Sequence, residues 1–427
     1  MEDGFKNPTE SPLLEPSQSS STGRETASSI QTLGNIIVSI VGTGILGLPF
    51  AFKIAGWLAG LLGVVISGAT TYYCMLLLVR CRDKLASQEL TQETTYGDLG
   101  YKSLGNTGRY LTESLIFISQ CGGSVAYLVF IGQNLSSIFG GYGPSFKSFI
   151  FLLVPIEIAL SWSRSLSALA PFSIFANVCN VLAMVIVVKG DIVKVLSGEF
   201  KFSDRKAITS NIGGLLLAGG MALFCFEGFG MTLALEASMR ETGRFPSLLA
   251  KAFAGITFVY VSFGFSGYMA YGDETKDIIT LNLPHNWSAI AVQIGLCLGL
   301  VFTCPIMLHP IHEIVEGKLK NGKWFQKLCY NEHGNSTKVE KYAIYLSRAI
   351  LIVALAVIAS FIPAFGVFSS LVGSTVCALI SFVLPATFHL KLLGPSLNFW
   401  QRSVDYCILV CGLLFAIYGT YTSIFGI

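Results

Sequence analysis

A succession of long apolar segments is the feature that most constrains this chain. After about the first thirty residues, segments long enough to cross a bilayer follow one another to the C-terminus. Only 12% of the 427 residues are charged and the mean hydropathy is +0.64, whereas a soluble protein carries roughly 25% charged residues. Backbone groups within a bilayer must be hydrogen-bonded inside their own segment, so we expect helices. The sequence therefore predicts an all-α polytopic membrane protein.

Eleven helices make up the predicted architecture. They cover residues 32–52, 55–79, 110–138, 148–162, 167–189, 211–237, 249–271, 286–309, 341–361, 364–388 and 404–426. The fourth is the weakest of these predictions because it is short and contains Glu157. Residues 1–30 are rich in Ser, Pro, Thr and Glu and cannot bury enough apolar surface to fold. We therefore expect a disordered tail (1–30) followed by a transmembrane domain (31–427).

Basic residues predict the orientation in the membrane. Lysine and arginine gather in the segments that share a side with the tail, such as those around Arg80, Arg82 and Lys320, and this side is expected to be cytosolic. A smaller basic group between residues 189 and 206 lies on the opposite side, together with three carboxylates. The majority places the C-terminus outside the cell or in a lumen. A net charge of +3 is too small to indicate nucleic acid binding.

The first span contains Val-Gly-Thr-Gly-Ile-Leu-Gly-Leu-Pro over residues 41–49. Gly42, Gly44 and Gly47 match the GxGxxG spacing of a dinucleotide-binding turn, but that turn links a soluble strand to a helix and precedes an acidic residue by about 20 positions. Neither condition holds here. Three glycines and a proline so close together instead predict that the helix unwinds, with its freed N–H and C=O groups lining an enclosed cavity. A simple packing kink is the alternative.

The sixth span has a comparable interruption, Phe-Cys-Phe-Glu-Gly-Phe-Gly over residues 224–230. Glu227 is expected in mid-span, where a carboxylate costs at least ~2.5 kcal/mol and so should face a cavity or have a partner. The alternative is a structural glutamate bonded to hydroxyls of neighbouring helices. Interrupted segments thus begin spans one and six, as two halves of five helices would require. Because five is odd, the second half is inverted, which is the inverted-repeat pattern of transporters.

This pattern divides the transmembrane domain into three parts. We expect a first repeat (32–189), a second repeat (211–388) and an extra helix (404–426). The substrate site of such a protein lies between its two discontinuous helices.

The same residues carry a resemblance to a known family. Residues 42–49 and 226–230, with Leu235 and Glu236, resemble the amino acid/auxin permease family of the amino acid–polyamine–organocation superfamily. Residues 96–100, 119–124 and 169–173 are similar to plant aromatic-and-neutral amino acid transporters of the vacuolar type. The resemblance implies a ten-helix inverted-repeat core with an eleventh helix.

The resemblance also implies a substrate site. It places the amino acid's carboxylate against backbone N–H groups of Gly42, Thr43 and Gly44, and its ammonium against freed carbonyls near Phe224, Cys225, Phe226 and Gly228. The polarity of helix ends supports this arrangement independently, because helix N-termini attract anions and C-terminal carbonyls attract cations. The rings of Phe224, Phe226 and Phe229 are expected at the site, where they could gate it or stack on an aromatic substrate.

The coupling ion is less well defined by the sequence. Some proton-coupled relatives have a histidine two turns before Gly-Thr-Gly, where this chain has Asn35, which cannot titrate. Glu227 is then the best candidate for a proton carrier, with Glu113 and Glu157 nearer to the span ends, and none of the five histidines is expected in mid-span. A sodium site built from carbonyls and hydroxyls such as those of Thr43 or Thr303 is the alternative. No bound cofactor and no structural metal are expected.

These features together predict a secondary active transporter that moves neutral and aromatic amino acids by alternating access and is driven by protons. No nucleotide-binding motif is present, so ATP is not expected to drive it directly. An amino-acid-sensing transceptor or scaffold without net flux is the alternative function. An enzyme is not expected, because it would need a nucleophile–base pair or a metal set within the spans, and Glu227 has no histidine neighbour. The vacuolar membrane is favoured over the plasma membrane, and the partners expected are an amino acid and lipid.

Overall fold

The computed structural model describes residues 28–87, 95–140, 145–162, 166–199, 202–239, 241–322, 325–326 and 338–425. The predicted tail (1–30) lies outside these residues except for its last three. Within the described ranges nearly all of the chain is helical. The helices are α1 (Ser29–Ile40), α2 (Leu48–Ala55), α3 (Trp57–Ala86), α4 (Tyr96–Ile138), α5 (Phe146–Ser161), α6 (Leu166–Lys194), α7 (Ile212–Cys225), α8 (Phe229–Ala237), α9 (Phe245–Tyr271), α10 (Trp287–Asn321), α12 (Lys338–Phe361), α13 (Phe365–Val372), α14 (Leu384–Leu393) and α15 (Phe399–Phe425).

These helices confirm the all-α polytopic fold. Among the described residues, nine helical stretches are long and apolar enough to cross a membrane, and α1 with α2 adds a tenth that is bent by 45°. The predicted fourth span corresponds to α5, a helix of 16 residues. At 1.5 Å per residue it reaches about 24 Å, which is less than the ~30 Å hydrocarbon core of a bilayer. The number of eleven spans therefore stays a prediction.

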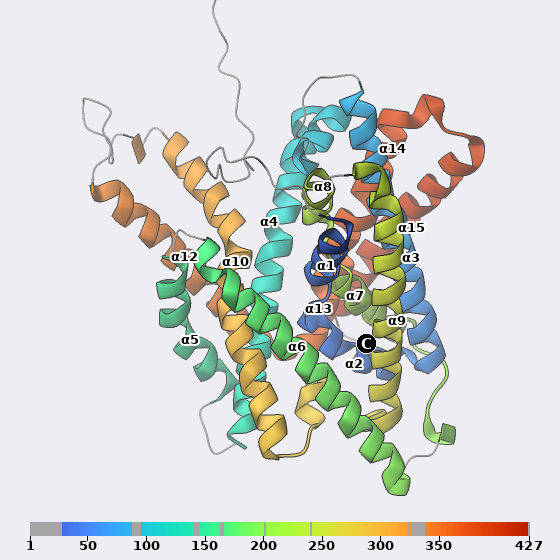
Figure 1. Ribbon diagram of the computed structural model, residues 1–427, viewed down its shortest axis with the longest axis vertical. Helices are drawn as coiled ribbons and strands as arrows, with labels where there is room; N and C mark the ends of the chain where they lie inside the picture. The colour runs from blue at the N-terminus through green and yellow to red at the C-terminus, as the bar shows by residue number, and fades with distance from the viewer. Residues whose placement is uncertain are drawn as a thin grey trace, which may run out of the picture.

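The helices form two flanks around a central group (Figure 1). Helices α5, α10 and α12 lie on one flank, and α3, α9, α14 and α15 lie on the other. Between them are the two halves of the first span, α1 and α2, together with α7 and α13. We call the side of the molecule on which α1 begins, at the top of Figure 1, the tail side.

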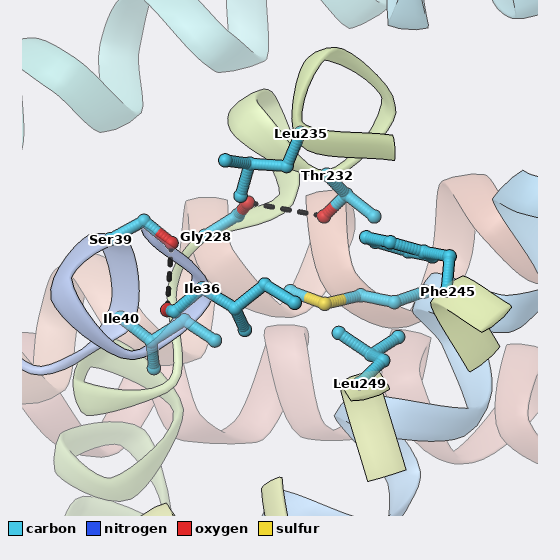
Figure 2. Close-up of a pocket in the computed structure, with 9 residues that line it drawn as sticks. Ile36, Ser39, Ile40, Gly228, Thr232, Leu235, Phe245 and Leu249 are labelled. Atoms are coloured by element: carbon cyan, nitrogen blue, oxygen red, sulfur yellow. Dashed lines mark hydrogen bonds between the residues drawn. The ribbon is translucent and has the colours of Figure 1, made fainter. Parts of the chain in front are cut away.

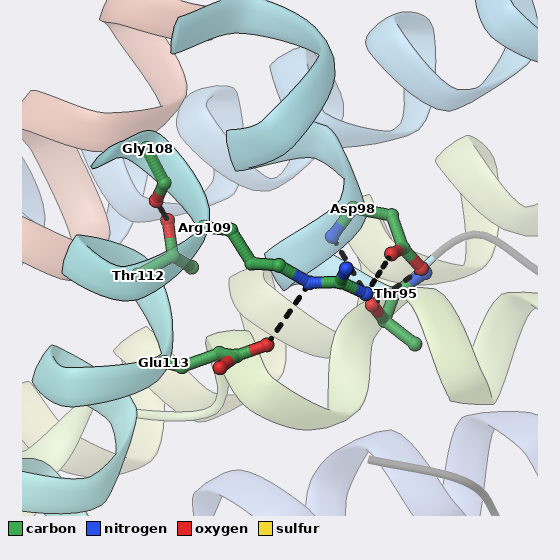
Figure 3. A network of polar contacts seen from close by, with 6 residues as sticks. All are labelled: Thr95, Asp98, Gly108, Arg109, Thr112 and Glu113. Carbon is green, nitrogen blue, oxygen red and sulfur yellow. Dashed lines mark hydrogen bonds and ion pairs between the residues drawn. The ribbon is translucent and has the colours of Figure 1, made fainter. Parts of the chain in front are cut away.

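Helix α4 extends further toward the tail side than the predicted span 110–138. It begins at Tyr96 and bends at Gly105, whose φ of +68° is a conformation that favours glycine. The turn before the bend is tied to the turn after it, because Arg109 pairs with Asp98 at 2.9 Å and with Glu113 at 3.2 Å (Figure 3). The sequence did not predict this extension because its polar side chains interrupt the apolar pattern.

Close packing in the centre depends on small residues. A Cβ atom added to Gly373, which follows α13, would collide with the backbone carbonyl of Gly220 in α7, and one added to Gly220 would lie 2.5 Å from the carbonyl oxygen of Ser370. The two backbones are therefore in contact. Since helices in lipid gain little from the hydrophobic effect, such close approach is a main source of their association.

We expect Gly373→Ala to destabilise the protein by about 1–3 kcal/mol, because the new methyl group meets backbone and no side chain can rotate away to relieve it. Thermal unfolding in detergent measures the effect. The matched control is Gly317→Ala in α10, where an added Cβ would meet nothing within 4 Å. Equal stability of the two variants would mean that α7 and α13 are not in backbone contact.

Candidate functional site

The first span is interrupted where the sequence predicted. Helix α1 ends at Ile40, Val41 and Gly42 are extended, and a single 3-10 turn (Thr43–Gly47) leads into α2. Pro49 occupies the first turn of α2, where its missing N–H costs no hydrogen bond. The bend of 45° between the two helices leaves carbonyls at the end of α1 and amides at the start of the turn without intrahelical partners.

The sixth span is interrupted too. Helix α7 ends at Cys225 and α8 begins at Phe229, with Phe226, Glu227 and Gly228 between them. Phe226 still donates its N–H to the carbonyl of Ala222 at 3.2 Å, so the regular hydrogen bonding of helix α7 stops only after Phe226. Both discontinuous helices predicted from the sequence are therefore present.

The two interruptions touch one another. A Cβ added to Gly44 would lie 3.1 Å from Cys225 Sγ and 3.5 Å from Phe224 Cδ1, while one added to Gly228 would lie 3.0 Å from Ile40 Cγ1. A glycine of each interruption thus packs against residues of the other interruption. At Gly42, by contrast, an added Cβ would meet nothing within 4 Å, so this stretch of backbone faces open space.

One side chain joins both interruptions. The hydroxyl of Tyr260, in α9, lies 3.1 Å from the carbonyl oxygen of Ile40 and 3.0 Å from that of Cys225, and it can donate its one proton to either. These are the last residues of α1 and α7, and their carbonyls are among those that the interruptions free. The Tyr260 side chain is completely buried.

A small crevice lies on the tail side of the interruptions (Figure 2). Its volume is about 190 Å³, which includes the space at its open mouth. Its only polar side chains, Ser39 and Thr232, donate to carbonyls of their own helices at 2.9 and 3.2 Å. The residues that line it come from α1, α3, α8 and α9, and none is charged: Ile36, Ser39, Ile40, Met75, Gly228, Thr232, Leu235, Phe245 and Leu249.

Glu227 lies where the chain enters α8. The backbone N–H groups of Gly228 and Phe229 begin the helix beside its carboxylate, and the positive end of the helix dipole favours a negative charge there. Its Oε2 atom is buried and has no hydrogen-bond partner. Glu227 therefore has one oxygen left for another ligand.

The three phenylalanines predicted at the site have different surroundings. Phe226 and Phe229 are fully buried, and Phe226 stacks on Phe253 with ring centroids 6.0 Å apart. Phe224 is only partly buried and packs edge-on against Phe365. Of the three rings, that of Phe224 is the most accessible.

The other acidic candidates lie apart from the interruptions. Glu113 pairs with Arg109 near the tail side (Figure 3). Glu157 is buried in α5 against the thiol of Cys304. Asn35 is exposed on α1. Thr303, the suggested sodium ligand, donates to the carbonyl of Gly299 in its own helix at 2.8 Å.

Two buried polar clusters were missed by sequence reasoning. Arg82 at the end of α3 pairs with Glu236 at the end of α8, and so fixes the tail-side half of the sixth span. Glu236 belongs to a motif noted in the sequence, but nothing there indicated its partner. The second cluster joins α3, α14 and α15: Asp405 is 2.6 Å from His389 Nδ1 and accepts from the Tyr73 hydroxyl at 2.9 Å.

The fold and the paired interruptions define a class of protein. A helical membrane protein whose first and sixth spans are broken at points that touch has the architecture of a secondary transporter. Similarity to solved structures agrees with this: the inward-facing conformation of Mhp1 superposes with a TM-score of 0.54 at 11% identity, over 97% of this chain and 92% of that one. At this identity the similarity bears on the fold alone.

Sequence comparisons give the family. The family described as transmembrane amino acid transporter protein matches residues 25–425. Amino acid transporter ANT1 of Arabidopsis thaliana is 67% identical over 97% of this chain and 96% of its own length, and amino acid transporter AVT3B of the same plant is 37% identical over 94% of each. The chain therefore belongs to the transmembrane amino acid transporter family and is a transporter, not an enzyme.

We expect Gly44→Val to abolish transport while the protein still folds, because the side chain would enter the contact between the two interruptions, where only glycine fits without steric cost. Uptake by the purified variant, measured beside its elution profile in size-exclusion chromatography, tests this. Gly255→Val in α9 is the control, since an added Cβ there meets nothing within 4 Å. Wild-type uptake by Gly44→Val would remove residues 42–44 from the site.

Proposed function

We propose that this protein moves neutral and aromatic amino acids across a membrane by alternating access, driven by protons, with the substrate held between the two interruptions. The observation that carries the proposal is the contact between the ends of α1 and α7, where two freed carbonyls converge on one hydroxyl. No charged side chain lines the neighbouring crevice. The backbone is thus the main polar surface available to a substrate here.

The polarity of these backbone groups matches an α-amino acid. Helices α1 and α7 both end at the contact, so the negative ends of two helix dipoles meet there and favour an ammonium group. The amides of Gly42, Thr43 and Gly44 head the next turn of helix and favour a carboxylate. Since Gly42 faces open space, a ligand can reach its backbone. Phe224, the accessible ring, would contact the side chain of the substrate.

We assign the coupling role to Glu227. It lies at the start of α8, directly after the residues proposed to bind the ammonium, and one of its carboxylate oxygens has no partner. A group that binds and releases a proton there would respond to occupancy of the site. Neutralising the carboxylate would also remove the cost of holding a charge at this depth.

The wider arrangement follows the sequence. We assign residues 32–189 and 211–388 to the two inverted repeats, each beginning with a discontinuous helix, and residues 404–426 to the extra helix. The tail side is assigned to the cytosol from the basic residues. A vacuolar membrane is favoured, because the yeast relative named vacuolar amino acid transporter 4 is 27% identical over 92% of this chain and 57% of its own length.

Uptake of radiolabelled phenylalanine into proteoliposomes, with and without an inward proton gradient, tests the function. We expect uptake above protein-free liposomes and a stimulation by the gradient. Binding without flux would instead indicate an amino acid sensor.

We expect acidic amino acids to compete poorly. A second carboxylate would enter a region whose crevice has no cationic side chain, and a charge at this depth costs at least ~2.5 kcal/mol, so glutamate should inhibit at least about tenfold more weakly than phenylalanine. Competition against radiolabelled phenylalanine measures the ratio. Equal inhibition would place the pocket elsewhere.

We expect Glu227→Gln to flatten the pH dependence of uptake and to leave exchange of internal for external substrate partly active, because glutamine keeps the size and the oxygen acceptor of glutamate but cannot carry a proton. Both modes are measured on the same preparation. Glu113→Gln, remote from the interruptions, is the control. A steep pH dependence that survives in Glu227→Gln would rule out the coupling role.

A further inference from the structure

Tyr260 holds a position that neither the family motifs nor the proposed site assigns to it. Its hydroxyl is the only side-chain donor recorded in the described residues for the carbonyls of Ile40 and Cys225. The ring is fixed by packing, with its centroid 5.0 Å from that of Phe226, which is itself stacked on Phe253. The hydroxyl is therefore held at the junction of the two interruptions.

This hydroxyl has fewer protons than it has partners. A tyrosine donates one hydrogen bond at a time, whereas two carbonyl oxygens lie within 3.1 Å of it. One carbonyl is therefore incompletely satisfied by protein at any instant, at a junction where Tyr260, Ile40 and Cys225 are all buried. An ammonium group has three N–H donors and could satisfy both oxygens together.

We propose that the Tyr260 hydroxyl stands in for the substrate's ammonium when the transporter is empty. In the empty protein it bridges the ends of α1 and α7 and lets the two broken helices close on one another. When an amino acid binds, its ammonium donates hydrogen bonds to both carbonyls, and the Tyr260 hydroxyl no longer donates to either. This inference rests on the proposed function and adds to it a residue that acts on the unloaded protein.

The inference separates two modes of transport. Net uptake requires the protein to return empty across the closed state, and this step depends on the bridge made by Tyr260. Exchange of one amino acid for another returns the protein loaded, so the ammonium makes the bridge in both directions. Removing the hydroxyl should therefore slow net uptake and spare exchange.

The experiment compares Tyr260→Phe with Tyr268→Phe in proteoliposomes supplied with external radiolabelled phenylalanine. Vesicles without internal substrate report net uptake, and vesicles loaded with unlabelled phenylalanine report exchange. Tyr268 is a matched control: it is buried two turns later in the same helix, and its hydroxyl accepts from the N–H of Lys206, away from the interruptions. We expect net uptake by Tyr260→Phe to fall about tenfold, the factor that one lost hydrogen bond of ordinary strength produces, with exchange within about twofold of wild type. Tyr268→Phe should retain the wild-type ratio of the two modes.

Other results would overturn the inference. A parallel fall of exchange and net uptake would make the hydroxyl part of the loaded site, and unchanged net uptake would show that the bridge is dispensable. If Tyr260→Phe unfolds on extraction, recovery of a monodisperse protein with phenylalanine in the buffer supports the inference, and failure to recover contradicts it. Wild-type protein that performs neither mode would contradict the proposed function itself, whereas active wild type with an unchanged ratio in Tyr260→Phe would contradict only the role of Tyr260.

Discussion

The requirement that backbone polar groups be satisfied inside a membrane governs this structure. Most spans meet this requirement with the hydrogen bonds of a continuous helix, but the first and sixth spans do not. The carbonyls freed at Ile40 and Cys225 meet at the hydroxyl of Tyr260, which belongs to α9. Both interruptions thus depend on a side chain from another helix, and the same freed groups are the ones that we propose to bind the substrate.

The remaining helices keep the interruptions together. Backbone contact between Gly220 and Gly373 fixes α7 against the stretch that follows α13, so the first half of the sixth span has little freedom. The second half, α8, is tied at its far end to α3 through Glu236 and Arg82. The uncharged crevice lies between α8, α1 and α9, where the described contacts are mainly apolar. Helix α1 contains no charged residue and so has no ion pair of this kind, and we therefore expect α1 to move more easily than α8.

Local chemistry explains what the sequence could predict. Glycine and proline act on their own stretch of chain, so both interruptions were predicted at the residues where the structure has them. The apolar segments predicted the positions of the spans for the same reason. They did not predict the polar start of α4 or the polar end of α10, which runs to Asn321 and not to 309, and α5 is shorter than a full span. Partners distant in the chain were beyond such reasoning: Tyr260 lies 220 residues from Ile40, and Tyr73 lies 332 residues from Asp405. A tyrosine in an apolar span looks like any other core residue until the fold brings two free carbonyls to it. Glu227 was expected to need a cavity or a partner, and the structure places it beside the first amides of α8 with one oxygen unpartnered.

The central claim is that the two interruptions form one site for an amino acid, and a cryo-electron microscopy map of the protein with phenylalanine bound tests it most directly. We expect density for the ligand at the junction, with its carboxylate at the amides of residues 42–44, its ammonium at the carbonyls of Ile40 and Cys225, and the Tyr260 hydroxyl displaced from both oxygens. Density confined to another part of the protein, with the Tyr260 bridge intact, would contradict the claim.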